Sequence, residues 1–332
     1  MSSPVRFAIL GFGLHATRRL MPAFAKSDDV VVTGIWRRNQ EAAAASCKEF
    51  GIPHCFATAE ELCASDDVDV VFITSPDAMH LDDCLLALRH GKAVLCEKPL
   101  AMNSDEATEI EAAAKAAGVV FGVAQNFRWN HSVEWMQRQI AAGRIGTPQL
   151  AHAQYCYPAQ TASRKWIADP TLACGGPIAD VGVHCIDTLR YLLGEDPLTI
   201  SVLAHKAAET DQVEAVATMQ LAMSGGVYAN VTASARAPYR TLLEVVGTEG
   251  TIIAENGLTV DRPVEIQVRK AGELLETVTV ENRDGYTRMI DAFAKAFRGE
   301  GEFMSTGAVS VLNQRALDAA YRSWKSGARE TI

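Results

Sequence analysis

The sequence predicts an α/β protein: a doubly wound parallel Rossmann sheet, then a C-terminal α+β domain with a large, mostly antiparallel open sheet. Up to residue 124, short Val- and Ile-rich runs alternate with amphipathic helical segments, which is typical of a parallel sheet covered on both faces. After residue 124, strand-like segments separated by short turns predominate, which is typical of an antiparallel sheet. We therefore place one domain at 1–124 and a second at 125–332.

Length and composition support two folded domains. The chain has 332 residues, and single cores stop growing near about 250–300 residues. The net charge of −9 argues against nucleic acid or an anionic membrane as the main partner. No apolar run approaches the roughly 20 residues of a membrane span, and "MSSPVRFAILGFG" lacks the pattern of a signal peptide. We expect a cytoplasmic protein.

The cysteines do not form a metal-binding pattern. There are eight, none of them in a CxxC pair, and most lie inside apolar segments. This usage is typical of reduced, buried thiols, and neither Cys–Cys nor His–His spacing predicts a zinc site. We expect no metal.

The first strand, at 5–10, leads directly into the loop "GFGLHA" and then a helical segment. Gly11 allows a tight turn, Gly13 lets the backbone approach a pyrophosphate, and Ala16 lets the helix pack closely. Phosphates would lie at the helix N-terminus, whose N–H groups and dipole favour anions. The pattern predicts a dinucleotide-binding domain.

The alternation continues through this domain. Further strands are expected at 30–36, 68–74, 93–99 and 119–124, and helices at 39–51, 80–91 and 104–118. In such a sheet, ligands meet the loops at the carboxyl ends of the strands. Here these loops are 11–16, 36–38, 74–80 and 96–99.

The end of the second strand selects the cofactor. An NAD enzyme usually carries Asp or Glu there for the ribose hydroxyls, but this chain reads Trp36-Arg37-Arg38. Arg37 can hold a 2′-phosphate by paired, charge-assisted hydrogen bonds, and Arg38 can do the same or stack on adenine. A pair of solvated arginines is the alternative. We predict NADP(H).

The second half has a different period. Helices are expected at 132–143, 177–193, 285–299 and 309–324, and strands at 149–158, 213–223, 227–235, 242–247, 251–255, 264–270 and 274–281. From residue 213 on, we count an antiparallel sheet of about six strands with one helical side, and we also place His205 in a strand. In the helix that follows Gly175-Gly176-Pro177, Asp180 and His184 are four residues apart and would share one helical face. A structural Asp–His pair is the alternative to a catalytic one.

The chain resembles the glucose–fructose oxidoreductase / inositol dehydrogenase / rhizopine-catabolism oxidoreductase family (Gfo/Idh/MocA). The resemblance covers almost the whole chain and rests on "GFGLHA", "TSPDAMH" (74–80), "CEKPLA" (96–101), "GGPIADVGVHCIDTLRYLLG" (175–194) and "VVGTEGTI" (245–252). Within the family, the sequence is most similar to the branch of NADPH-dependent 1,5-anhydro-D-fructose reductases, which also lack the acidic residue at the second strand.

The resemblance implies a role for each matching residue. Lys98 would contact nicotinamide ribose and substrate, and Asp180 and His184 would be catalytic. The implied cofactor contacts are Gly11, Phe12, Gly13, Leu14, Arg37, Arg38, Thr74, Ser75, His80, Glu97, Lys98, and Gln125 or Asn126 near the nicotinamide. Trp166 and Tyr286 would join Lys98, Asp180 and His184 around the substrate. A homodimer or higher homo-oligomer would form through the C-terminal sheet.

Hydride transfer to a carbonyl builds negative charge on oxygen, so donors must face that atom. His184 would give the proton, Asp180 would favour the protonated imidazole, and Lys98 would add positive charge. We therefore expect an NADP(H)-dependent dehydrogenase or reductase acting on a sugar, keto-sugar or cyclitol. The alternatives are a non-catalytic NADP-sensing regulator of the same fold, and a glycosidase or dehydratase that recycles its cofactor.

Overall fold

The computed structural model describes residues 3–159 and 165–332. It divides into two compact units, Met1–Ala124 with Tyr286–Val311 and Gln125–Gly285 with Leu312–Ile332. We predicted a second domain at 125–332, whereas Tyr286–Val311 groups with the first unit. The reason lies in the packing of α8 (Gly285–Phe297), because its Phe293 ring lies 6.2 Å from that of Phe7 in β1, centroid to centroid.

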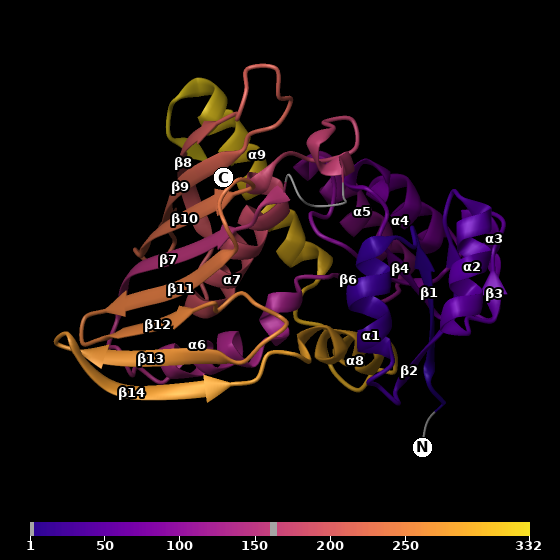
Figure 1. The fold of residues 1–332 in the computed structure, drawn as a ribbon, viewed down its shortest axis with the longest axis horizontal. Coiled ribbons are helices and arrows are strands. Elements are labelled where there is room, and N and C mark those ends of the chain that lie inside the picture. The colour runs from indigo at the N-terminus through magenta and orange to yellow at the C-terminus, as the bar shows by residue number, and fades with distance from the viewer. Residues whose placement is uncertain (1–2, 160–164) are drawn as a thin grey trace. The chain divides into compact units, whose positions relative to one another are not determined.

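The first unit contains a parallel sheet, drawn from indigo to purple in Figure 1, and its strand order is β3-β2-β1-β4-β5-β6. This is the order of a doubly wound dinucleotide fold, and it confirms the predicted fold class. The strands are β1 (Val5–Leu10), β2 (Val30–Trp36), β3 (His54–Cys55), β4 (Val70–Ile73), β5 (Ala93–Cys96) and β6 (Phe121–Val123). The helices besides α8 are η1 (Ala16–Leu20), α1 (Met21–Phe24), α2 (Gln40–Phe50), α3 (Ala59–Ala64), η2 (Asp77–Met79), α4 (His80–Arg89) and α5 (Ser104–Ala117).

Strand register brings the predicted ligand loops to one edge of this sheet. Leu10 pairs with both Trp36 and Ile73, and Ile73 pairs with Cys96, so four strands end side by side. Two short elements, β3 and α3, were not predicted, because two and six residues are too few to display a period. The helix after the glycine loop also differs, since its first turn, η1, is a π-helix.

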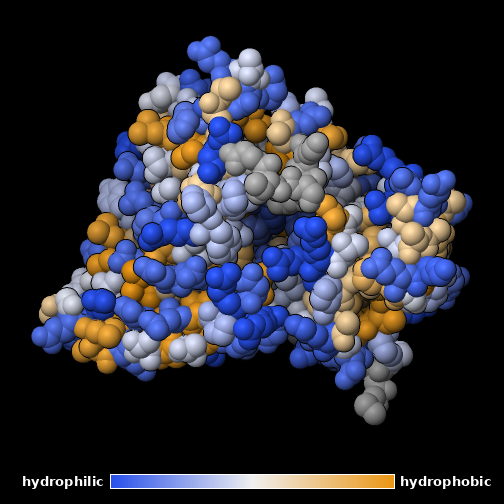
Figure 2. All heavy atoms as spheres, viewed as in Figure 1, coloured by the Kyte–Doolittle hydropathy of each residue, from blue (hydrophilic) through white to orange (hydrophobic). Residues whose placement is uncertain are grey.

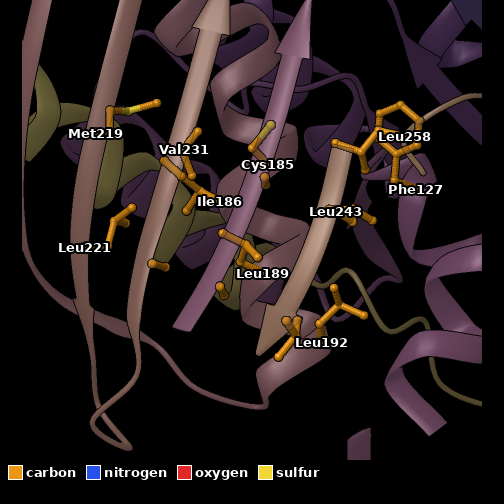
Figure 3. Packing of buried hydrophobic residues seen from close by; sticks show 14 of the residues in the cluster. Phe127, Cys185, Ile186, Leu189, Leu192, Met219, Leu221, Val231, Leu243 and Leu258 are labelled. Atoms are coloured by element: carbon orange, nitrogen blue, oxygen red, sulfur yellow. The ribbon is translucent and has the colours of Figure 1, made fainter. Parts of the chain in front are cut away.

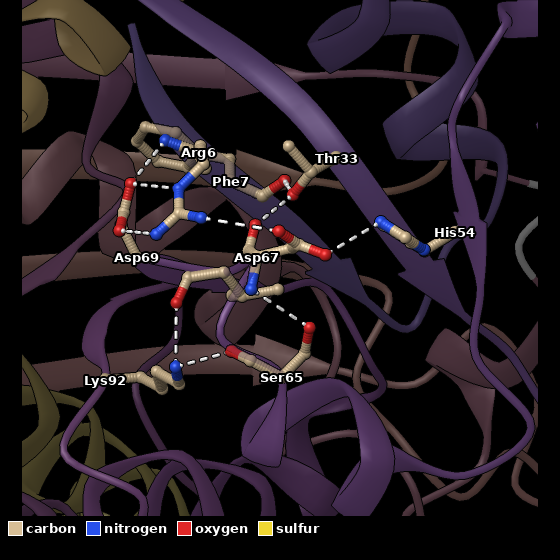
Figure 4. A network of polar contacts seen from close by, with 9 residues as sticks. Arg6, Phe7, Thr33, His54, Ser65, Asp67, Asp69 and Lys92 are labelled. Carbon is tan, nitrogen blue, oxygen red and sulfur yellow. Dashed lines mark hydrogen bonds and ion pairs between the residues drawn. The ribbon is translucent and has the colours of Figure 1, made fainter. Parts of the chain in front are cut away.

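A polar network ties the opposite, amino-terminal edge together (Figure 4). The Arg6 guanidinium donates to both carboxylate oxygens of Asp69, at 3.0 and 2.7 Å. Asp67 lies 3.6 Å from Arg6 and 3.2 Å from the His54 imidazole. Lys92 donates to two carbonyl oxygens just before β4. Stabilising contacts thus gather at one edge of the sheet and the ligand loops at the other.

The second unit contains a nine-stranded sheet in the order β14-β13-β12-β11-β7-β10-β9-β8-β15. Its strands are β7 (Pro148–Cys156), β8 (Pro197–His205), β9 (Val216–Met223), β10 (Tyr228–Ser234), β11 (Arg240–Gly247), β12 (Thr251–Glu255), β13 (Val264–Lys270), β14 (Glu273–Val280) and β15 (Glu330–Thr331). Its helical segments are η3 (Asn126–Trp129), α6 (His131–Ala141), η5 (Lys165–Ala168), η6 (Ile178–Gly182), α7 (Val183–Leu193) and most of α9 (Gly307–Ser326).

The sheet is antiparallel except where β7 and β10 pair in parallel, which confirms the mostly antiparallel prediction. The count of about six strands was too low. β8 was not predicted as an element, although His205 at its end was placed in a strand, and β15 has only two residues. β15 pairs with β8 from the far end of the chain, a contact that no local pattern encodes.

Helix α7 covers one face of this sheet (Figure 3). Its residues Cys185, Ile186 and Leu189 are buried against Val231 of β10 and Leu243 of β11, and form one apolar cluster with them. The apolar stripe predicted for this segment therefore forms the core of the second unit. The same packing fixes the position of the helix that carries Asp180 and His184.

Some apolar side chains remain at the surface of the sheet. In Figure 2 hydrophobic residues are visible over the end that carries β13 and β14, where Leu274 and Leu275 are exposed. No helix among the described residues is long and apolar enough to cross a membrane. In the same residues, no cluster of three or more His, Cys, Asp or Glu side chains could hold a metal ion.

Candidate functional site

The glycine loop is fixed by backbone contacts to two neighbouring loops. Gly11 has a φ of +90°, and a Cβ there would lie 2.5 Å from the backbone nitrogen of Ser75. The N–H groups of Gly11 and Phe12 both donate to the carbonyl oxygen of Trp36, at 3.0 and 3.1 Å. Only glycine meets both the conformation and the space at position 11, so this residue shapes the loop.

The rest of the loop is more open. At Gly13, the nearest atom to an added Cβ would be the Gly11 carbonyl oxygen at 3.7 Å, and Leu14 is exposed. Phe12, in contrast, is buried against the ring of Phe50. Because its N–H is also bonded, Phe12 can support the loop but has neither its side chain nor its amide available for a ligand.

The tip of β2 carries two guanidinium groups. Arg38 is exposed and Arg37 half-buried, and neither guanidinium has an ion pair or hydrogen bond with the described residues. Asn39 follows them and caps α2, its side chain accepting from the Ala42 N–H at 2.9 Å. The cap fixes the backbone beside the arginines and leaves their side chains available to bind an anion.

The loop after β4 is held by side-chain hydrogen bonds within the first unit. Thr74 donates to the Gly11 carbonyl at 3.0 Å, and Ser75 donates to Asp83 at 2.6 Å. His80 is fully buried, and its ring nitrogens lie 3.0 Å from the carbonyl oxygens of Ser75 and Pro99. In the structure, His80 therefore links the loop after β4 to the loop after β5.

The loop after β5 places an acidic and a basic residue in succession. Glu97 forms an ion pair with His15 of the glycine loop, Nε2 to Oε1, at 2.9 Å. Burial alone would raise the pKa of Glu97, but the charge and hydrogen bond of His15, with Lys98, lower it. The His15 ring also lies 5.7 Å from that of Tyr286. Glu97 is therefore a carboxylate held beside Lys98, and Tyr286, a predicted substrate residue, lies at the glycine loop.

In the second unit, Asp180 and His184 are both buried, at 6% and 7% exposure. The helix that carries them departs from the α-helical spacing assumed from sequence, because Ile178–Gly182 forms a π-helical turn. The Tyr157 hydroxyl donates to Asp180 Oδ2 at 2.5 Å. A π-helical turn is common at functional sites, and here it coincides with the candidate acid–base pair.

Aromatic rings surround the imidazole of His184. The ring of Phe127 lies edge-on at 4.7 Å, and that of Tyr155 is stacked at 6.4 Å, centroid to centroid. Tyr155 also lies 6.4 Å from Tyr157. These rings restrict the orientation of the imidazole, and through Tyr157 the same aromatic group reaches Asp180.

A buried ionic network joins α7 to the segment before α6. Arg128 donates to both oxygens of Asp187, at 2.8 Å each, and Asn313 of α9 donates to the same carboxylate at 2.7 Å. Arg190 donates to the Asn313 side-chain oxygen at 2.6 Å. Since Phe127 precedes Arg128, this network also fixes the ring that faces His184.

The remaining predicted site residues have less defined surroundings. Gln125 and Asn126 are buried, and Gln125 Oε1 and Asn126 Nδ2 have no hydrogen-bond partner within the described chain. Trp166 is half-buried on the short helix η5. Two contacts of the site, Tyr157 with Asp180 and His15 with Glu97, were not predicted from the sequence. Tyr157 was included in a predicted strand, but nothing in a single sequence indicates its contact with Asp180.

The carboxyl edge of the first sheet fits a dinucleotide. The first hydrogen bond of the helix after the loop runs from Thr17 N–H to the Gly13 carbonyl, at 3.0 Å. N–H groups ahead of such a bond have no acceptor inside the helix and are suited to phosphate. Gly13 leaves space for a ligand to approach the backbone, and the two guanidinium groups at the tip of β2 add donors for its anionic groups.

Comparison with known proteins supports this description. Residues 5–125 match the family model described as an oxidoreductase family with an NAD-binding Rossmann fold, and residues 133–253 match the GFO/IDH/MocA C-terminal domain. The 1,5-anhydro-D-fructose reductase of Ensifer adhaerens is 33% identical, over 91% of this chain and 91% of its own length. The scyllo-inositol 2-dehydrogenase (NADP(+)) of Bacillus subtilis (strain 168) is 30% identical, over 83% of each chain.

A solved structure is similar over nearly the whole chain. The aldose-aldose oxidoreductase of Caulobacter crescentus, complexed with glycerol, matches with a TM-score of 0.90 and 22% identity, covering 99% of this chain and 100% of that one. At this level of identity, the likeness concerns the fold. It extends across both the parallel and the nine-stranded sheet.

Proposed function

Because the chain belongs to the GFO/IDH/MocA family of oxidoreductases, with its NAD-binding Rossmann fold, we propose that it is an NADP(H)-dependent sugar or cyclitol oxidoreductase. The reaction would interconvert a carbonyl and a hydroxyl group of a sugar, keto-sugar or cyclitol. Two relatives support this substrate class, since one is named a 1,5-anhydro-D-fructose reductase and the other a scyllo-inositol dehydrogenase.

The cofactor assignment depends on the residues at the tip of β2. Arg37 and Arg38 stand there without a carboxylate, and their guanidinium groups have no ion pair or hydrogen bond with the described residues. An Asp or Glu at this place would repel a 2′-phosphate, whereas a guanidinium binds it by charge-assisted hydrogen bonds. Such a contact contributes about 1.5–3 kcal/mol, which corresponds to roughly 10- to 150-fold in preference.

The test is the Arg37→Asp variant. We expect its ratio of kcat/KM with NADPH to kcat/KM with NADH to fall by about 10- to 150-fold. Arg269→Asp is the matched control, because it makes the same charge change at an exposed position of the second unit. An unchanged ratio in Arg37→Asp would refute the NADP(H) assignment.

The chemistry assigns one task to each of four side chains. A bound nicotinamide would supply hydride exchange with a substrate carbon. Lys98 would supply positive charge to the substrate oxygen, and His184 would give a proton in reduction or remove one in oxidation. Asp180 would favour the imidazolium form of His184, and Tyr157 holds Asp180 by its hydrogen bond.

Single variants test these roles. We expect His184→Ala to lower kcat by about 10²–10⁴, the usual contribution of a positioned general acid or base. NADPH affinity, measured by fluorescence titration, should be retained, because the glycine loop and the tip of β2 belong to the other unit. The assay follows NADPH absorbance across a panel of aldoses, keto-sugars and inositols. A His184→Ala enzyme with normal turnover would exclude this residue as the proton donor.

We also propose that two or more copies associate through the uncovered face of the second sheet. Strand register places Leu150, Tyr228 and Leu203 on one face, with exposures of 51%, 66% and 77%. Val231 of β10, three residues after Tyr228, faces the opposite side and packs in the α7 core. Apolar side chains clustered on an uncovered sheet face support an interface between copies.

A further inference from the structure

The helix that carries Asp180 and His184 begins with two amides that need acceptors from outside the helix. The N–H groups of Ala179 and Asp180 both donate to the Gly176 carbonyl, at 3.1 and 2.9 Å. Pro177 has no N–H. The amides of Gly176 and Ile178 therefore remain, and no side chain at the start of this helix caps them.

Glu214 supplies both acceptors from a distant part of the chain. Its Oε2 accepts from the Gly176 N–H at 3.1 Å, and its Oε1 accepts from the Ile178 N–H at 2.8 Å. The Tyr321 hydroxyl also donates to Oε1, at 3.1 Å. Glu214 is only 2% exposed, so these three donors take the place of water around its carboxylate.

The two glycines of "GGP" provide the space for this cap. A Cβ at Gly175 would lie 1.7 Å from the Tyr321 hydroxyl oxygen. A Cβ at Gly176 would lie 2.2 Å from the backbone oxygen of Glu214 and 2.9 Å from its carboxyl carbon. The glycine pair, Glu214 and Tyr321 thus form one close-packed cluster at the beginning of the helix.

The hydrogen bonds favour the ionised form of Glu214. All three partners donate, and a carboxylate accepts through both oxygens without presenting a donor of its own. Burial raises the pKa of Glu214 above its ordinary value, and the hydrogen bonds from Ile178, Gly176 and Tyr321 offset this only in part. A glutamine here would present an NH₂ group to one of the two amides, so one of them would lose its acceptor.

We propose that Glu214 is a positioning residue for the reaction: it fixes the first turn of the helix and thereby the directions of Asp180 and His184. The turn it caps, Ile178–Gly182, contains Asp180 and leads directly into His184. Its buried carboxylate next to the positive end of that helix also adds favourable charge. The proposal rests on the proposed function of the Asp180–His184 pair.

Glu214→Gln tests the proposal by three measurements on the full chain. We expect kcat to fall by about tenfold, which equals about 1.4 kcal/mol in activation free energy, while the NADPH dissociation constant stays within about twofold. Amide exchange of 176–184 should become about tenfold faster, with β9 and β10 still protected. The imidazole NMR signals of His184 should shift. Glu195→Gln is the matched control, because Glu195 also accepts a backbone N–H, from Gly225, but at a surface turn.

The outcomes separate a positioning role from a purely structural one. The proposal would be overturned by faster amide exchange at 176–184 with no loss of kcat and no shift of the His184 NMR signals. Unchanged amide exchange would overturn it as well. If Glu214→Gln does not fold, Tyr321→Phe decides, because it keeps both amide contacts and removes one donor. We then expect a roughly two- to fivefold loss of kcat and a shift of the His184 signals, and the absence of both overturns the proposal. A wild-type chain inactive on the whole substrate panel would refute the proposed function instead, while the exchange and NMR results would still decide whether Glu214 positions His184.

Discussion

Asp187→Asn tests the buried network that holds α7 in place. The variant keeps the size of the side chain but removes the charge that faces Arg128, whose own side chain is only 8% exposed. It also changes the acceptor of the Asn313 amide, which lies 2.7 Å from Asp187 Oδ1. In the wild type, burial by itself would lower the pKa of Arg128, and Asp187 raises it. The Arg128 guanidinium therefore stays charged in its buried position.

Breaking such a pair from one side is costly because the remaining charge stays buried. We expect the free energy of unfolding to fall by about 3–5 kcal/mol, the usual result for a buried ion pair that loses one partner. For a unit of this size, that corresponds to a decrease in Tm of about 6–20 °C. Urea unfolding followed by far-UV circular dichroism, with a thermal scan, measures both quantities.

Two further variants complete this experiment. Glu249→Gln is the control, because its ion pair with Lys270 is well exposed on both sides and should contribute less than about 1 kcal/mol. The double variant Arg128→Met, Asp187→Leu removes both charges and should recover much of the loss. If Asp187→Asn costs less than about 1 kcal/mol, the network does not stabilise α7 as argued.

Other predictions concern the glycine loop, acid stability and self-association. Gly11→Ala should abolish NADPH binding in a fluorescence titration, because its Cβ would lie 2.5 Å from the Ser75 nitrogen. Gly51→Ala is the control: Gly51 also has a positive φ, but its Cβ would meet no atom within 4 Å, so this variant should still bind NADPH. Burial would raise the pKa of Asp69, but its hydrogen bonds with Arg6 lower it, so its stabilisation is present at neutral pH and is lost as pH falls below about 4. Asp69→Asn should therefore lose less stability than wild type between pH 7 and pH 3 in urea unfolding; an equal loss in both would contradict this assignment. Leu203→Asp with Tyr228→Asp should convert an oligomer to a monomer in sedimentation, and a wild-type monomer would refute the proposed interface.

The architecture was largely predictable because its main signals are local. "VRFAIL" followed by "GFGLHA" identifies a strand, a tight turn and a helix within a few residues, and the structure places β1 and Gly11 accordingly. The elements that were missed lack a local period or depend on distant partners. β15 has two residues, and its pairing with β8 brings together segments more than a hundred residues apart.

Less of the candidate site could be predicted, because many of its contacts join residues that are distant in the sequence. Arg37 and Lys98 could be assigned because each follows a strand at the edge where ligands bind. Glu214 and Tyr321 lie in a strand-like segment and a helix, and only tertiary packing brings them to Gly176. The π-helical turn at Ile178–Gly182 was also missed, since its residues fit an α-helical stripe equally well.

That turn has a consequence for how the acid–base pair can change during evolution. A π-helical turn holds one residue more than an α-helical turn, so removing one residue between Asp180 and Val183 would rotate the preceding part of the helix by about 100° relative to α7. Asp180 and His184 would both survive such a deletion, but they would then be three residues apart and the angle between them around the helix axis would change. That angle thus depends on a residue count, and a comparison of side-chain identities alone would overlook a change in it.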